Sequence, residues 1–242
     1  YTVHVPETAS IEIYGVNGAS ETGVDLPDTL WIRGDGNYSL GNMKGRCGNI
    51  TLKDLFYSQR SQGDGGIGCD YAYQTSAKLV MQNCAVVNNN YYNATWFARG
   101  MHDVVLDRCY LYIVLGNWPG SLIQNSHSVT LTNGTEYILK YGAQYIAYSP
   151  FTVTREAKSR YRDAVFTIKD SSMRVLANFA SQNAVCHGFD WMYDVVVEGT
   201  GSLTSDRYLS LDKLVMKDSA RVSVGDDSHN GYLFCSDITV ED

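Results

Sequence analysis

The sequence predicts an all-β fold: a single solenoid of roughly ten coils, in which short parallel strands stack along the chain. A phrase of aliphatic and β-branched residues followed by a polar pair returns eight times. Three copies keep one spacing, since Met81, Leu106 and Leu131 are separated by 106 − 81 = 25 and 131 − 106 = 25 residues. Helical periodicity is almost absent. Repeats of 20 to 30 residues suit one three-strand coil of a parallel β-helix, and 242 residues divided by 25 give about ten coils.

The eight copies of the phrase run through most of the chain. They are Ile50–Asp54, Leu79–Asn83, Val104–Arg108, Val129–Asn133, Phe166–Asp170, Val195–Gly199, Leu214–Asp218 and Ile238–Asp242. Each reads as a strand closed by a turn residue. In stacked coils the inward residues form apolar columns, and Asn or Asp at the turns form hydrogen-bonded ladders.

The elements before and between these phrases are less regular. Residues 11–13 and 30–32 predict strands, and a turn follows at 34–36. The spacing widens to 29 residues between Leu52 and Met81. It widens to 37 between Leu131 and Ile168, which predicts one inserted loop around 137–163 with a helical turn or two inside it. Loops on a rigid scaffold are where function usually lies.

On these eight phrases the chain resembles the right-handed parallel β-helix proteins of the pectate-lyase-like superfold. It is most similar in character to secreted or surface-attached β-helical repeat proteins of bacteria. The resemblance covers residues 50–242 well and residues 1–48 loosely. It implies right-handed coils and a secreted or cell-surface location. A β-sandwich or a propeller is the competing prediction.

Composition narrows the classes of partner. With 26 acidic and 19 basic residues the net charge is −7, which disfavours nucleic acid. No apolar stretch reaches the roughly 18 residues of a membrane span. The chain starts at Tyr1 without Met and closes on a repeat phrase. We therefore expect one domain over residues 1–242, taken from a longer protein with further domains.

The six cysteines lack metal-ligand spacing. Cys84 and Cys109 fall one coil apart, within the Cα separation that a disulfide needs. A stacked pair of reduced interior cysteines is the favoured interpretation, and a disulfide is the alternative.

Two segments are candidates for binding a polysaccharide or surface glycan. Aromatic faces stack on sugar rings, and cationic groups pair with carboxylated or sulfated sugars. The candidate binding residues are Tyr141, Tyr145, Tyr148 and Arg155 in the inserted loop, and Tyr91, Tyr92 and Trp96 beside a run of asparagines. The alternatives are that the tyrosines belong to the core and that the asparagines form a turn ladder.

Candidates for catalysis are weaker. Lys158, Arg160 and Arg162 would serve a lyase as base or clamp, and a carboxylate and an imidazole stand three residues apart in His187 and Asp190. We find neither the aspartate pair of polygalacturonases nor the Asp-Pro-His motif of alginate epimerases. Turn or loop positions are the simpler explanation for all five residues.

Metal sites have two sequence candidates. No cofactor is expected except calcium, for which Asp64 and Asp70 on a glycine-rich loop are weak candidate ligands. A tight turn is the favoured explanation of this loop. His102 and His127 share one register, so we expect their imidazoles to stack in adjacent coils. Such a pair either binds a metal, titrates together, or merely occupies equivalent turns.

The function favoured by the sequence is carbohydrate or host-surface recognition by an adhesin-like domain. The alternatives are a polysaccharide lyase or glycoside hydrolase acting on an acidic glycan, and a structural spacer. A recognition module predicts exposed coplanar aromatic rings. An enzyme predicts converging carboxylates and basic groups, and a spacer predicts neither.

Overall fold

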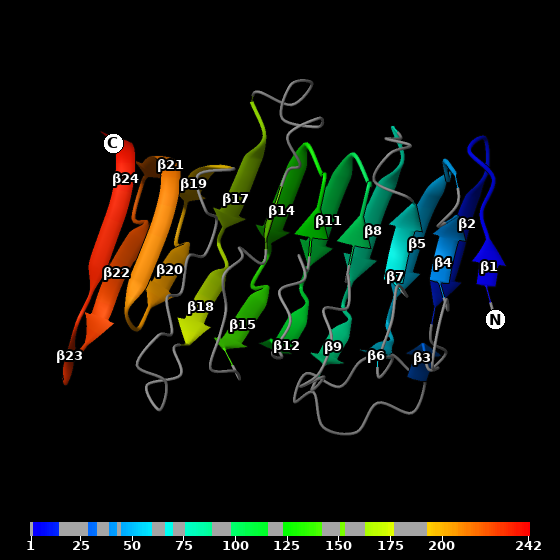
Figure 1. Cartoon of the computed structure of the whole chain (residues 1–242), viewed down its shortest axis with the longest axis horizontal. Coiled ribbons are helices and arrows are strands. Elements are labelled where there is room, and N and C mark those ends of the chain that lie inside the picture. The colour runs from blue at the N-terminus through cyan, green and yellow to red at the C-terminus, as the bar shows by residue number, and fades with distance from the viewer. Residues whose placement is uncertain are drawn as a thin grey trace.

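The structure is an array of parallel strands stacked along one axis, with the two termini at opposite ends (Figure 1). It is a computed structural model that describes residues 2–14, 29–32, 39–42, 45–59, 66–69, 76–88, 98–115, 123–141, 151–152, 163–176 and 193–242. Every regular element in these ranges is a β-strand, and none of them is a helix.

The strands form three sheets, which we call A, B and C. Sheet A contains β1 (Thr2–His4), β4 (Ser39–Asn42), β7 (Gly66–Cys69), β10 (Ala98–Arg99), β13 (Ile123–Gln124) and β16 (Phe151–Thr152). Sheet B contains β2 (Ser10–Tyr14), β5 (Asn49–Lys53), β8 (Lys78–Gln82), β11 (Asp103–Asp107), β14 (Ser128–Thr132), β17 (Val165–Lys169), β19 (Asp194–Glu198), β21 (Tyr208–Lys217) and β24 (Tyr232–Glu241). Sheet C contains β3 (Thr29–Ile32), β6 (Phe56–Gln59), β9 (Ala85–Asn88), β12 (Tyr110–Leu115), β15 (Glu136–Tyr141), β18 (Ser172–Leu176), β20 (Ser202–Ser205), β22 (Arg221–Asp226) and β23 (His229–Asn230).

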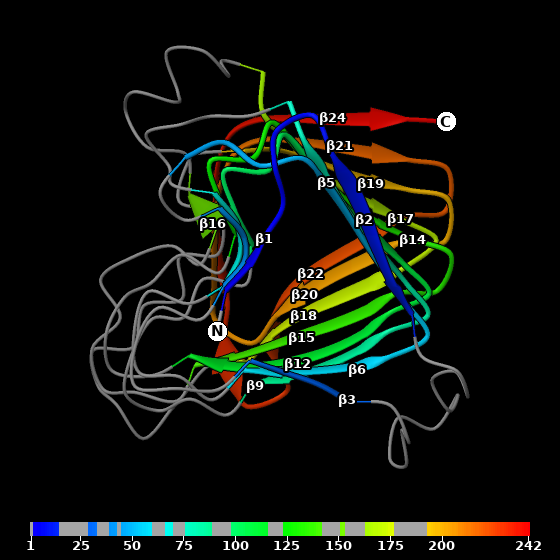
Figure 2. The same ribbon diagram turned by 90° about the vertical axis from the view of Figure 1, so that its right-hand side faces the viewer.

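The chain visits the sheets in a fixed order. From β1 to β16 it passes through A, B and C in turn. From β17 to β22 the strands alternate between B and C, and β23 then forms a hairpin with β22 before the chain returns to B at β24. Neighbours within a sheet are parallel, and the short hairpin of β22 with β23 is the exception among the described pairs. Figure 2, which looks along the stack, shows sheets B and C meeting at a sharp corner. This parallel, solenoid-like arrangement differs from the antiparallel sheets of a sandwich or propeller.

The register predicted from the 25-residue spacing is confirmed. Leu106 pairs with Met81 on one side and with Leu131 on the other. The longer spacing of 37 residues between Leu131 and Ile168 does not change the register, because these two residues still pair in sheet B. Extra residues therefore lengthen a connection and leave the ladder of sheet B intact.

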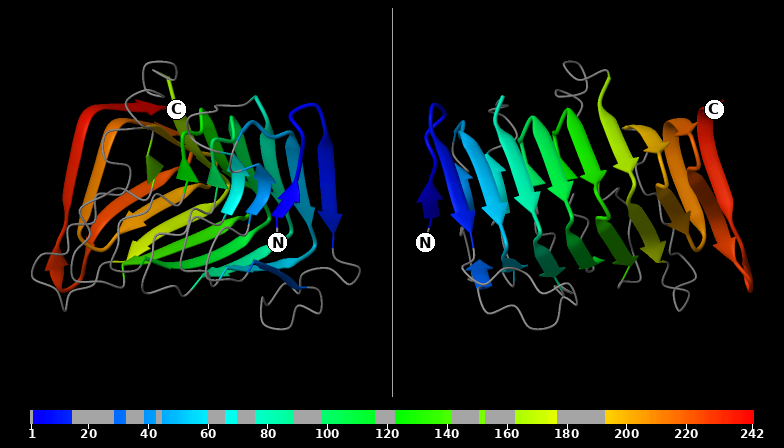
Figure 3. Two further views of the ribbon diagram at one scale, coloured as in Figure 1. Left: turned by 45° about the vertical axis from the view of Figure 1, so that its right-hand side comes forward. Right: turned by 180° about the vertical axis from the view of Figure 1, so that it is seen from behind.

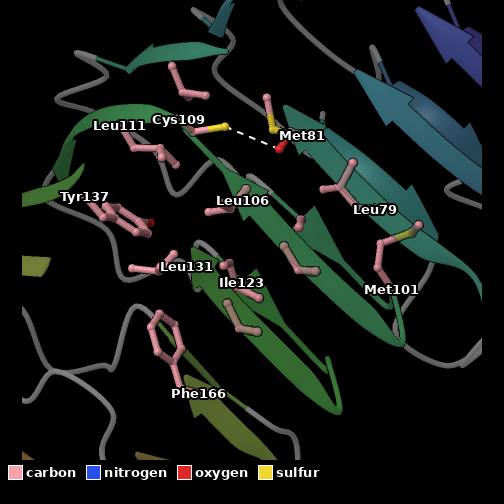
Figure 4. Packing of buried hydrophobic residues seen from close by; sticks show 14 of the residues in the cluster. Leu79, Met81, Met101, Leu106, Cys109, Leu111, Ile123, Leu131, Tyr137 and Phe166 are labelled. Atoms are coloured by element: carbon pink, nitrogen blue, oxygen red, sulfur yellow. Dashed lines mark hydrogen bonds between the residues drawn. The ribbon is translucent and has the colours of Figure 1, made fainter. Parts of the chain in front are cut away.

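The interior consists of apolar columns that run along the stack (Figure 4). The first and third residues of the phrases in sheet B point inward, while the second residue is partly exposed, as the strict alternation of a strand requires. Sheet C adds a column that contains Val86, Leu111, Tyr137 and Met173. At the last strand, β24, the corresponding Ile238 and Val240 are 51% and 71% exposed.

A left-handed residue stands at each corner between sheets B and C from β5 to β22. The residue that closes the phrase has a positive φ in seven successive coils. These residues are Asp54, Asn83, Arg108, Asn133, Asp170, Gly199 and Asp218. Asn, Asp and Gly adopt this conformation at the lowest cost, which explains why the phrases end as they do.

The predicted ladder of turn amides and carboxylates is confirmed. Asn83 Nδ2 donates to Asp54 Oδ1 at 2.7 Å, and Asn133 Nδ2 donates to Asp107 Oδ1 at 2.9 Å. Further along the stack, the backbone N–H of Thr200 donates to Asp170 Oδ1 at 2.9 Å. Each bond joins one coil to the next, so the corner side chains reinforce the backbone ladder.

Cys84 and Cys109 are reduced and buried, as the favoured interpretation expected. The thiol of Cys84 donates to the carbonyl of Gln82 at 3.2 Å, and the thiol of Cys109 donates to the carbonyl of Met81 at 3.4 Å (Figure 4). The hydrogen bond with Cys84, together with burial, raises the pKa of the Cys109 thiol. A protonated interior thiol of this kind is chemically inert.

The predicted inserted loop around 137–163 is wrong at its first boundary. Residues 137–141 belong to β15, which pairs with β12 and β18, because their hydrophobic side chains continue a core column of sheet C. Tyr137 is fully buried, and its burial raises the pKa of the phenol. Of the remainder of the predicted loop, Phe151–Thr152 forms β16 in sheet A, while the helical turn lies outside the described residues.

Arg108 tests the corner rule, by which we mean that Asn, Asp and Gly stabilise the left-handed corner positions better than other residues. It has φ 53° and an exposed side chain whose ion pair with Asp107 contributes little. Arg108→Asn should raise the free energy of unfolding by about 0.5–1 kcal/mol, because Asn tolerates the left-handed conformation better. The measurement is urea denaturation.

The reverse change, Asn83→Arg, is the matched control. It should destabilise the protein by more than the amount gained, since the hydrogen bond from Asn83 to Asp54 is lost as well. Equal or lower stability of Arg108→Asn would contradict the corner rule.

Candidate functional site

Most of the residues singled out in the sequence lie outside the described part of the chain. These are Tyr145, Tyr148, Arg155, Tyr91, Tyr92, Trp96, Lys158, Arg160, Arg162, His187, Asp190, Asp64 and Asp70. Tyr141 is the last residue of β15, and its side chain is likewise outside the description. For these residues the structure gives the strands to which their segments are attached.

The two aromatic segments are attached to the same pair of sheets. Residues 89–97 follow β9 and precede β10, and residues 142–150 follow β15 and precede β16. Both segments therefore leave sheet C and enter sheet A, in coils separated by one intervening coil. By contrast, Arg155 lies between β16 and β17, on the connection from sheet A to sheet B.

A polar cluster of His102, Asp103 and His127 lies where the chain enters sheet B. His102 immediately precedes β11, and His127 immediately precedes β14. Their rings are stacked with centroids 4.8 Å apart and planes 27° apart, which confirms the predicted stacking. The backbone holds this geometry, because the N–H of His127 donates to the carbonyl of His102 at 2.8 Å.

Asp103 links three neighbours of this cluster. Its Oδ1 lies 3.0 Å from His102 Nδ1 and accepts a 2.7 Å bond from the Ser128 hydroxyl, while its Oδ2 lies 3.3 Å from Lys78 Nζ. Burial acts to raise the pKa of the Asp103 carboxyl, but the hydrogen bonds from Ser128, His102 and Lys78 outweigh it and lower the pKa. The carboxylate therefore stays ionised and can accept a hydrogen bond or bind a cation.

The cluster is open to solvent on one side. The side chains of His102 and His127 are 34% and 30% exposed. A second carboxylate is close, since Asp163 Oδ1 lies 3.4 Å from His127 Nε2 and its side chain is largely exposed. Two imidazoles and a carboxylate in reach of solvent have the chemistry of a metal site or of a proton-exchanging pair.

A second feature is a group of aromatic side chains at the far end of the stack, which we call the aromatic strip: Tyr208, Tyr232 and Phe234. The rings of Tyr208 and Tyr232 are 5.2 Å apart and 18° from parallel. Tyr208 and Phe234 are 6.3 Å apart and 22° from parallel. Tyr232 and Phe234 are 50% and 49% exposed. The strip therefore presents partly exposed aromatic rings that are stacked on one another in nearly parallel planes.

Arg207 adds a cation to the aromatic strip. Its guanidinium carbon lies 5.1 Å from the centre of the Tyr208 ring. The strip lies on β21 and the terminal strand β24, which form one end of the stack in both views of Figure 3. Flat rings beside a guanidinium group suit a ligand with ring faces and negative charge.

Charged side chains on the outer face of sheet B are paired from coil to coil. Lys169 Nζ contacts Glu198 at 3.1 Å, and Lys217 Nζ contacts Glu241 at 2.9 Å. Both pairs join residues in equal register on adjacent strands. These carboxylates are paired along the sheet and do not converge on one point as an active site requires.

Comparisons with protein-family models, with curated proteins and with solved structures returned no match. The described segments include no helix with the length and hydrophobicity required to cross a membrane.

The aromatic strip and the role of Asp103 were not predicted from the sequence. Tyr208 and Tyr232 each stand six residues before the first apolar residue of a phrase, since 214 − 208 = 6 and 238 − 232 = 6. This equal offset could have predicted that the two tyrosines lie side by side in adjacent coils. Asp103 could have been found because it directly follows His102 and opens a strand that pairs with β8 and β14.

Asp103 makes the stability of the protein dependent on pH. Its folded-state pKa lies below the ordinary value of 3.8, so its contribution is complete above that value and is lost as the pH falls through the folded-state pKa. Asp103→Asn should therefore destabilise the protein at about pH 7, and its deficit relative to wild type should shrink below about pH 4. Urea denaturation across this range measures the deficit.

Asp163→Asn is the control for this prediction, because the Asp163 side chain is 81% exposed. It should change stability little at either pH. A deficit for Asp103→Asn that stayed constant down to about pH 2 would contradict the assignment.

Proposed function

We propose that this chain is a right-handed parallel β-helix of the pectate-lyase-like kind that recognises an acidic glycan, as part of a secreted or cell-surface protein. Right-handed, closed coils are supported by the repeated order of the three sheets and by the strong general preference of parallel crossovers for that hand. Because the superfold hosts many activities, the recognition role has to be argued from the side chains.

The observation that carries the proposal is the aromatic strip. The strip differs from the coplanar rings expected of a recognition module, because its rings are stacked, but Tyr232 and Phe234 still expose about half of their surface, at 50% and 49%. Arg207 beside Tyr208 supplies the charge that favours uronate or sulfate groups over neutral sugars.

The connections from sheet C to sheet A supply further candidate binding residues. The segments with Tyr91, Tyr92 and Trp96, and with Tyr145 and Tyr148, are attached to the same two sheets. In contrast, the corner between B and C is two or three residues long in the seven successive coils from β5 to β22, although the connection from β2 to β3 is longer. Where the connections at one corner differ in length and sequence, binding residues are more often found there than at a corner of constant length.

The proposal favours recognition over catalysis or a spacer role. Lys169 and Lys217 neutralise carboxylates along sheet B, where a lyase or hydrolase would need converging ones. A spacer requires no cation beside stacked rings, whereas the guanidinium of Arg207 lies 5.1 Å from the centre of the Tyr208 ring.

The test is binding of the chain to a polyuronate, a sulfated glycan and a neutral polysaccharide. The double variant Tyr232→Ser with Phe234→Ser should weaken binding to the acidic glycans by about tenfold or more, because each ring contact contributes about 0.5–1.5 kcal/mol. Arg207→Gln should weaken binding to the acidic glycans only, and salt should reduce the difference. Isothermal titration calorimetry provides the affinities.

Val240→Ser is the matched control, because Val240 is an exposed apolar residue of the same strand that lies outside the strip. Its affinity should equal that of wild type. Unchanged binding by the strip variant, with loss in Tyr141→Ala with Tyr145→Ala, would move the site to the connection after β15. Release of shortened chains, detected by mass spectrometry, would replace recognition with catalysis.

A further inference from the structure

We propose that His102, Asp103 and His127 form a binding site for a divalent zinc-type cation at the entry to sheet B. One ligand atom from each of these residues lies within 4.8 Å of the others. The two imidazoles come from consecutive coils, and the carboxylate comes from the residue next to His102. The inference is independent of the proposed glycan recognition.

The ligand set determines the class of cation. Imidazole nitrogen combined with carboxylate oxygen suits zinc and similar transition ions, whereas calcium and magnesium prefer oxygen alone. Around a tetrahedral zinc, ligand atoms are separated by roughly 3.4 Å. Because all three side chains are partly exposed, they can close from 4.8 Å by side-chain rotation while the backbone stays in its ladder.

The neighbouring positions leave the cluster accessible. The residues equivalent to the two histidines in the coils on either side are Ala77 and Ala164, since each immediately precedes a register partner in sheet B. Both are small. Asp163, with Oδ1 3.4 Å from His127 Nε2, is positioned to orient that imidazole or to supply a fourth ligand.

Lys78 opposes the binding of a cation. Its ammonium group lies 3.3 Å from Asp103 Oδ2, but the side chain is 60% exposed and can swing into solvent. Removing this charge should therefore strengthen binding. A purely structural role for the cluster would give no such gain, because the same change deletes an ion pair.

The experiment is a titration of the chain with zinc alone, in competition with a chromogenic chelator. Wild type should bind one zinc ion per chain at this site, and binding should raise the melting temperature. His102→Gln, His127→Gln and Asp103→Asn should each weaken binding by about 100-fold. Lys78→Ala should strengthen it by roughly fivefold to tenfold.

His229→Gln is the matched control. His229 Nδ1 lies 2.9 Å from Asp226, so it is also a histidine–aspartate pair, but it stands outside the three-residue cluster. Its affinity for zinc should equal that of wild type. Cobalt replacing zinc should give visible bands of nitrogen and oxygen ligands without a thiolate charge-transfer band, which excludes the cysteines as ligands.

Two results would overturn the proposal: failure of the folded wild-type chain to bind zinc, or wild-type affinity in both histidine variants. Should a variant fail to fold, nuclear magnetic resonance of the wild-type imidazoles decides the question. Zinc must then shift the resonances of His102 and His127 and leave those of His229 unchanged.

Discussion

The stacked arrangement depends on the left-handed residue at each corner between sheets B and C. In this conformation the residue turns its own N–H toward the next coil: Asp54 donates to the carbonyl of Gln82 at 3.0 Å, and Asn83 donates to that of Asp107 at 2.9 Å. The left-handed residue therefore carries the hydrogen-bond ladder into the corner. A corner that closes in so few residues leaves no room for a change of register.

Fixed register then determines which side chains meet. A shift of one residue would turn every inward side chain of a strand to the outside, so the columns through Leu106 and Leu111 require the same register in every coil. The outer face obeys the same constraint, since Lys78 faces Asp103 and Lys213 faces Asp194 on adjacent strands. One corner geometry thus organises both the core and the surface charge.

The sequence predicted the features that repeat in every coil, but it did not predict the extent of β15 or the aromatic strip. The phrases predicted strands, columns and corner residues, because each coil faces the same steric requirement. The extent of β15 was misjudged, since Tyr137 was counted with a tyrosine-rich loop although its neighbours Ile138 and Leu139 continue the core. The aromatic strip was missed because two coils alone carry its tyrosines, and a pattern of two copies does not stand out from 18 tyrosines.

The same register explains why both candidate sites are arrays. Identical residues at one spacing become neighbours about 4.8 Å apart in a parallel sheet. The histidines are separated by 127 − 102 = 25 residues and stack, and the tyrosines of the strip stack at a step of 232 − 208 = 24. A change of one residue type in two successive coils is then enough to create a paired site. Because the corner residues set the register of the strands, such pairs can arise at the other edges of the coil without disturbing the core.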